Sequence, residues 1–182
     1  MPESSASEHI PYTVKRSKRS RYMRLVVQPG GVVVLTVPWG TREKAIMRFI
    51  ERQSNWIARA VRKMAGLIPL PARGRRAYLK HRETAREYIE NRVEFWSNLY
   101  KLPYKRVAIR DTKARWGSCS REGNLNFSYA LLFLPKALAD YVIVHEICHL
   151  KEHNHSKEFW QLVECAIPDY KAKRAELRRY AL

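Results

Sequence analysis

The 182-residue sequence is poor in several features, and each shortage excludes a class of protein. Its three cysteines are too few and too far apart for a disulfide framework, which indicates a reducing compartment, the cytoplasm. No apolar run approaches the length of about 18 residues that a transmembrane helix needs. The polar stretch over residues 1–9 lacks the apolar core of a signal peptide. The 17 acidic residues are outnumbered by 35 basic ones, so the sequence predicts a strongly basic intracellular protein.

The net charge of +18 has two interpretations. It can attract a polyanion such as nucleic acid, a nucleotide, a ribosome or an anionic membrane, or it can form a basic surface without a partner. The densest basic run, residues 15–21, can likewise contact phosphates or form a solvated turn that protects an edge strand. Base stacking needs aromatic platforms, and none interrupts this run, so the run itself favours the solvated turn. Weak association with nucleic acid through the basic surface is therefore a prediction from charge alone.

Hydrophobic residues make up 46% of the chain, enough for a folded core. Their patterns predict strands over residues 12–18, 22–27, 31–37, 104–111 and 125–132. They predict helices over about 41–65, 76–101, 135–152, 156–167 and 169–182. This order predicts an α+β fold in which a twisted, mainly antiparallel sheet packs on helices. We expect a flexible tail over residues 1–9 and a single domain over 10–182, with an N-terminal hairpin and helices in 10–101 and a metal-site part in 102–182.

One predicted helix carries a chemical motif. His145, Glu146 and His149 form H-E-x-x-H, and positions i and i+4 of a helix lie on one face. Two imidazoles there can bind one zinc ion, or another divalent metal that accepts imidazole ligands. Glu146 can reach a zinc-bound water, whose pKa the metal lowers to about 7. The motif therefore predicts a zinc-dependent hydrolase with Glu146 as its general base.

A catalytic zinc site needs a third protein ligand, and two histidines compete for that position. His155 follows His149 by six residues, the spacing of metzincin sites, although the metzincin glycine between them is absent. His153 would share the face of His145 if the helix continued, but about 12 Å along its axis would separate them, too far for one ion. The spacing therefore favours His155, which lies past the predicted end of the helix and can fold back.

Arg115 and Trp116 are further candidates for the site. They can join neighbouring strands through packing or a cation–π contact. Alternatively, Arg115 can stabilise a developing oxyanion or contact a substrate phosphate. The two roles are equally compatible with the residues.

Three segments resemble the YgjP-like metallopeptidase family. They are Arg115–Ser120, Asp140–Leu150 and Asn154–Trp160. The resemblance extends over nearly the whole chain after residue 10. It implies a compact zincin-like domain related to the SprT-like and WLM proteases. It also implies that His145, His149 and His155 bind zinc and that Glu146 is the base.

Fold analogy does not establish a substrate, so we consider three functions. The first is a metallopeptidase that acts on a peptide or protein, held as an added strand along the sheet edge over residues 125–132. The second is a phosphohydrolase, a pyrophosphatase of nucleoside triphosphates, favoured by the net charge and Arg115 but opposed by the lack of a Gly-rich phosphate loop. The third is a nucleic-acid- or ribosome-binding protein with a structural metal, opposed because structural zinc usually has four protein ligands. The ligand spacing and the resemblance favour the peptidase.

Overall fold

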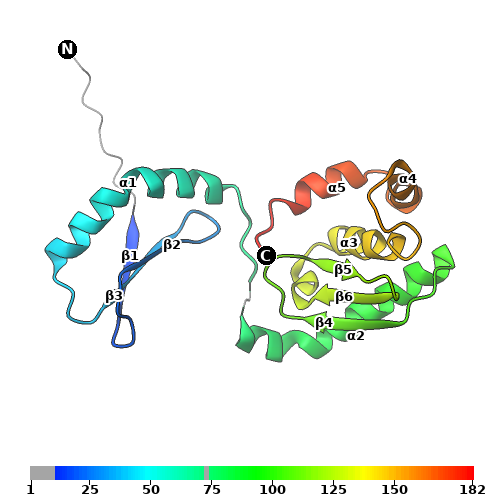
Figure 1. Ribbon diagram of the computed structural model, residues 1–182, viewed down its shortest axis with the longest axis horizontal. Helices are drawn as coiled ribbons and strands as arrows, with labels where there is room; N and C mark the ends of the chain where they lie inside the picture. Colours follow the sequence, from blue (N-terminus) through cyan, green and yellow to red (C-terminus); the bar gives the residue numbers. More distant parts are fainter. Residues whose placement is uncertain (1–10, 72–73) are drawn as a thin grey trace, which may run out of the picture. The chain divides into compact units, whose positions relative to one another are not determined.

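The computed structural model describes residues 11–71 and 74–182 and divides the chain into two compact units, Met1–Pro69 and Leu70–Leu182 (Figure 1). The first unit contains β1 (Tyr12–Ser17), β2 (Arg24–Val27), β3 (Val33–Pro38) and α1 (Glu43–Ala65). The second contains α2 (Arg75–Tyr100), β4 (Arg106–Arg110), β5 (Gly117–Cys119), β6 (Asn124–Ser128), the 3₁₀ helix η1 (Tyr129–Phe133), α3 (Lys136–Cys148), α4 (Lys157–Ala166) and α5 (Tyr170–Leu177). The tail predicted over residues 1–9 lies outside the described residues. None of the described helices is both long and apolar enough to cross a membrane.

The first unit is a three-stranded sheet with α1 packed on one face. Strand β3 is central because its alternate residues Val33, Leu35 and Val37 are almost completely buried. These side chains contact the apolar side of α1, which includes Ile46 and Ile57. Strands β2 and β3 are antiparallel and form the predicted N-terminal hairpin, whereas β1 pairs in parallel with β3. The basic run at residues 15–21 therefore leads from β1 to β2 between opposite edges of the sheet.

The sheet of the second unit repeats this topology, with β6 between β4 and β5. Strand β4 is parallel to β6, and β5 is antiparallel to it. The predicted α+β fold is confirmed, but each sheet mixes the two directions and neither is mainly antiparallel. The predicted strand over residues 125–132 ends at Ser128, whose hydroxyl accepts a hydrogen bond from the Ala130 N–H at 3.3 Å and starts η1. The three-residue strand β5 was too short to predict.

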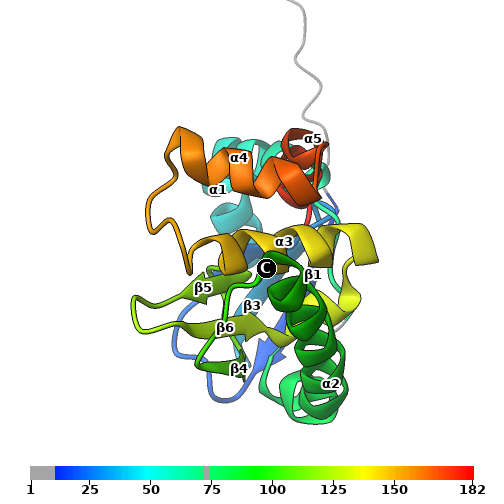
Figure 2. The same ribbon diagram turned by 90° about the vertical axis from the view of Figure 1, so that its right-hand side faces the viewer.

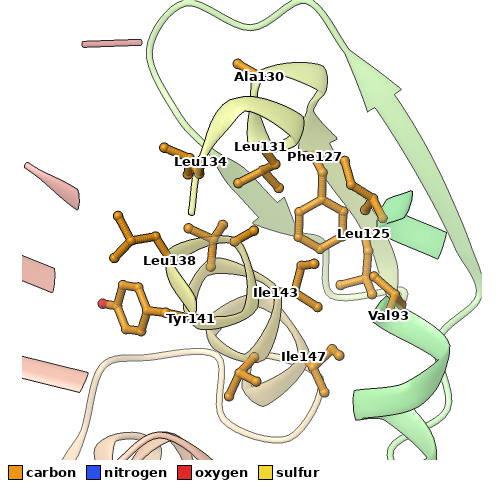
Figure 3. Packing of buried hydrophobic residues seen from close by; sticks show 14 of the residues in the cluster. Val93, Leu125, Phe127, Ala130, Leu131, Leu134, Leu138, Tyr141, Ile143 and Ile147 are labelled. Carbon is orange, nitrogen blue, oxygen red and sulfur yellow. The ribbon is translucent and has the colours of Figure 1, made fainter. Parts of the chain in front are cut away.

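Helix α3 lies in the middle of the second unit, with the sheet on one side and α4 and α5 on the other (Figure 2). Its Ile143 and Ile147 pack in the same core as Leu125 and Phe127 of β6 and Val93 of α2 (Figure 3). Every residue from 138 to 148 except His145 is buried. A helix that is apolar nearly all round needs such cover on all sides. This burial holds the helix that carries the H-E-x-x-H motif in one orientation.

Helix α2 belongs to the second compact unit, which begins at Leu70. The reason is packing, because Ala85, Ile89 and Val93 are completely buried in the core that α3 shares. A partly buried ion pair adds to this contact. The Arg92 guanidinium donates two hydrogen bonds, of 2.7 and 2.8 Å, to the Asp140 carboxylate of α3.

We predict that this pair contributes to stability well above a surface ion pair. Arg92→Met keeps an apolar stem against Phe95 and Trp96 but leaves the buried Asp140 carboxylate without its partner. The free energy of unfolding should fall by about 3 kcal/mol in urea denaturation followed by circular dichroism. The control Arg86→Met breaks only exposed pairs on α2 and should cost below about 1 kcal/mol. Equal losses in the two variants would contradict the role of the Arg92–Asp140 pair.

Candidate metal centre

The three histidines of the predicted site come from two neighbouring segments. His145 lies in the last turn of α3 and His149 is the residue at its C-cap, so the helix ends earlier than the predicted residue 152. The chain then turns back through His155 to α4. The Ser156 hydroxyl accepts a hydrogen bond from the Phe159 N–H at 3.3 Å and caps α4, the helix that the sequence predicts from residue 156. This cap holds His155 beside the end of α3.

The imidazoles of His145, His149 and His155 are close enough to share one metal ion. One ring nitrogen of each lies within 4.8 Å of the others. The Nε2 atoms of His145 and His155 are 3.1 Å apart, and two ligands of a tetrahedral zinc with bonds of about 2.0–2.1 Å are separated by about 3.3 Å. His153 lines the same cavity but lies outside this group. The donor set and its spacing therefore fit a zinc ion.

A backbone contact orients one of these rings. The Nδ1 atom of His149 lies 2.8 Å from the carbonyl oxygen of Glu152, so Nδ1 donates its proton there and leaves Nε2 free to accept a metal. This pairing of a ring N–H with a carbonyl is the usual support for a metal-binding imidazole. The Nδ1 atom of His145 is buried and has no hydrogen-bond partner among the described residues.

Burial keeps the imidazoles of His145 and His149 uncharged. It lowers the pKa of His145 to about 3, and the proximity of His149, His155 and Arg174 acts in the same direction. Burial also lowers the pKa of His149, although its hydrogen bond to Glu152 partly opposes the shift. At neutral pH both rings are therefore neutral, which is the form that binds a metal.

Two aromatic residues of α4 enclose the histidines. Phe159 is completely buried, and its ring centroid lies 4.4–4.9 Å from those of His145, His149 and His155. Trp160 stacks on His155 at 5.6 Å. The sequence predicts the helix that carries both residues, but not that they form a wall against the site. Helical periodicity identifies a buried face without identifying what that face touches.

Glu146 points toward β5 and is 7% exposed. A Cβ atom on Gly117 would lie 2.6 Å from its Cγ and 2.8 Å from its Oε1, so only glycine leaves room for the carboxylate. The Cys119 N–H donates a hydrogen bond to this carboxylate. Burial raises the pKa of Glu146 to about 8, and the Arg115 charge and the Cys119 N–H limit the rise. A carboxyl group with a pKa near neutrality can take up and release a proton there.

Two cavities meet at Glu146 and His145. One, of about 310 Å³, is lined by the histidines and by residues of β5. The other, of about 220 Å³, is lined by Arg115 and Trp116. The structure therefore brings both predicted residues beside Glu146. The Trp116 carbonyl also accepts a hydrogen bond from the Ser128 N–H at 2.8 Å, which ties this segment to the end of β6.

The free sheet edge beside the histidines differs from the predicted one. Residues 125–128 belong to β6, which is paired on both sides, so they offer no edge. Strand β5 lies at the edge and supplies Gly117 and Cys119 to the wall of the cavity. The sequence predicted the wrong strand because alternation shows which face is buried but not which strands are neighbours.

The chain resembles two solved metallopeptidase zymogens, and no curated protein matches it. It is 26% identical to abylysin of Pyrococcus abyssi over 52% of this chain and 99% of that chain, with a TM-score of 0.45. It is 20% identical to jannalysin of Methanocaldococcus jannaschii over 50% of this chain and 91% of that chain, with a TM-score of 0.44. Residues 72–180, which include the whole histidine cluster and Glu146, match the family described as YgjP-like, metallopeptidase domain. The chain therefore belongs to the YgjP-like metallopeptidase family.

Proposed function

We propose that the protein is a zinc-dependent metallopeptidase in which His145, His149 and His155 bind the metal and Glu146 is the general base. The observation that carries this proposal is the convergence of three imidazoles, with one ring nitrogen of each within 4.8 Å of the others, beside a buried carboxylate. Three imidazole ligands without a fourth protein ligand are typical of catalytic zinc and not of structural zinc.

The residues of the chain have separate roles in this mechanism. Zinc would supply the Lewis acidity that polarises the scissile carbonyl and activates water. Glu146 accepts the proton of the attacking water and passes it to the leaving amine. The Cys119 N–H and the missing side chain of Gly117 hold that carboxylate in place. Arg115, whose charge already acts on Glu146, can stabilise negative charge that develops on the carbonyl oxygen.

The edge strand β5 offers a place for the substrate. An extended peptide can add to a free sheet edge through backbone hydrogen bonds, with its side chains pointing alternately to both faces. Because β5 borders the cavity that contains the histidines, a peptide paired with it would pass over Glu146. We therefore propose an unfolded or extended polypeptide as the substrate.

A metal-dependent phosphohydrolase of nucleoside triphosphates is the second candidate. The observation that favours it is positive charge at the centre, because Arg115 acts on Glu146 and Arg174 acts on His145. Guanidinium groups are common ligands of phosphate. The family match favours the peptidase, so we rank the phosphohydrolase second.

We also place the protein in a reducing compartment such as the cytoplasm. Its cysteines are all free, with Cys148 buried, Cys119 half-buried and Cys165 exposed. An exposed free thiol is typical of proteins that remain in a reducing environment.

The two candidates differ in the product they release. We expect the zinc-loaded protein to release peptides from an unfolded protein, with no phosphate or pyrophosphate from nucleoside triphosphates. Glu146→Gln should keep stoichiometric zinc and lower turnover by about 10²–10⁴-fold, because only the proton acceptor is removed. Release of phosphate or pyrophosphate alone, dependent on Glu146, would replace the first candidate by the second. Loss of zinc from a folded Glu146→Gln variant would show that this carboxylate is a ligand.

The third ligand can be identified by metal retention. His155→Ala should lower zinc affinity by more than about 100-fold, since loss of a mere supporting contact already costs about 10–100-fold. His153→Ala is the matched control on the same loop and should change the affinity little. Zinc content after dialysis against a graded series of chelator concentrations measures both. A larger loss in His153→Ala would reverse the assignment.

Gly117 can be tested as the residue that positions the base. Gly117→Ala should displace the Glu146 carboxylate and lower turnover by at least about 100-fold, since a misplacement of about 1 Å can have that effect. Zinc should be retained, because no ligand changes. The control Gly66→Ala adds a methyl group with no atom within 4 Å and should keep full turnover. Wild-type turnover in a folded Gly117→Ala variant would mean that Glu146 needs no such room.

A further inference from the structure

The described part of the first unit has many basic residues and few acidic ones. Its residues 11–69 hold 13 lysines and arginines and only two acidic residues, Glu43 and Glu51, which gives a net charge of +11. All 13 are exposed, and no ion pair joins any of them to an acidic group within the described part of this unit. The ion pairs of the described chain all lie in the second unit. The charge of the first unit is therefore largely uncompensated.

Six of these cations lie on the outer side of α1. They are Lys44, Arg48, Arg52, Arg59, Arg62 and Lys63. At about 100° per residue they fall within an arc of about 100°, on the side opposite the buried Ile46 and Ile57. The row from Lys44 to Lys63 is about 28 Å long, because a helix rises about 1.5 Å per residue. Trp56, 42% exposed, lies at the margin of the row between Arg52 and Arg59.

We propose that this outer face of α1 binds the phosphate backbone of nucleic acid without sequence preference. Cations four residues apart on a helix are about 6 Å apart along its axis, and the row spans about eight phosphates of one duplex strand at about 3.4 Å each. Like charges at this spacing repel one another, and a polyanion relieves the repulsion. The exposed ring of Trp56 adds a surface on which a base or sugar can pack.

Other occupants fit this face less well. An amphipathic helix lies in a membrane by inserting its apolar side, but the apolar side of α1 is covered by β3. A second copy of the chain would present the same positive charge and be repelled.

The basic run at residues 15–21 is a weaker candidate than α1. The Arg16 guanidinium already donates to the carbonyl oxygens of Trp39 at 3.2 Å and Thr41 at 2.9 Å. Lys18 lies over the Trp39 ring at 5.6 Å. These contacts hold two cations of the run against their own unit. In the row on α1, the Arg52 Nε donates to the Arg48 carbonyl oxygen at 3.3 Å, a contact within the helix that leaves both side chains exposed on its outer face.

This proposal is independent of the peptidase, because the metal centre lies wholly in the second unit. The test uses the full chain and fluorescence anisotropy with labelled 20-base-pair DNA and RNA duplexes over a salt series. The variant replaces Lys44, Arg48, Arg52 and Arg59 by Gln. The control replaces Lys80, Arg121, Lys136 and Arg179 of the second unit, which are exposed and change the net charge equally. Circular dichroism verifies that both variants are folded.

We expect wild-type binding to weaken as salt rises. The slope of log affinity against log salt should fall by about 3.6 in the α1 variant, since each of the four lost phosphate contacts removes about 0.9. Affinity at low salt should drop more than about 10-fold in this variant and clearly less in the control. DNA binding, RNA binding or both would support the proposal. Phosphatidylserine vesicles are the third probe. Equal losses of duplex affinity in the two variants, no duplex binding at low salt, or a loss in the α1 variant confined to vesicle binding would each overturn the proposal.

Discussion

The burial of α3 is the constraint on which the rest of the site depends. Apolar side chains surround this helix on nearly every side, and the ion pair between Arg92 and Asp140 joins it to α2. The helix can therefore neither rotate nor slide without exposing core residues or separating that pair. Because His145 and Glu146 are adjacent on it, they point to neighbouring sides, one toward α4 and the other toward β5. One rigid helix thus places the His145 imidazole and the Glu146 carboxylate in a fixed relation.

Burial has an energetic cost that the surrounding backbone offsets. Glu146 and His145 are both shifted toward their neutral forms because water is largely excluded. The Cys119 N–H stabilises the ionised carboxylate, and the Glu152 carbonyl holds the His149 ring in one tautomer. The polar groups of the site are therefore supported mainly by main-chain N–H and carbonyl groups of the strand and loop around α3. The main-chain groups within α3 are used by the helix itself.

This reliance on the main chain explains what the sequence could and could not reveal. The H-E-x-x-H spacing specifies side chains on one helix, so His145, Glu146 and His149 were identifiable, and most helices and strands followed from periodicity. Every residue has an N–H and a carbonyl, so nothing in the sequence marks Cys119 or Glu152 as supports. Gly117 could not be identified as a glycine within a strand, because the strand that carries it, β5, has only three residues and was not predicted. Strand pairing was lost because alternation does not identify neighbours, which is why the edge was assigned to β6 instead of β5.

The two units also differ in how they treat charge. In the second unit acidic partners compensate part of the positive charge, as in the pairs of Arg86 and Arg92. In the first unit α1 uses its apolar side to cover the sheet, and its outer side holds cations with almost no acidic neighbours. Neither feature requires the other, because no residue is shared between the row on α1 and the histidine cluster. Substitutions without shared partners generally act independently. A chain altered at both places should therefore lose peptide cleavage and nucleic-acid binding by the same factors as the two separate variants.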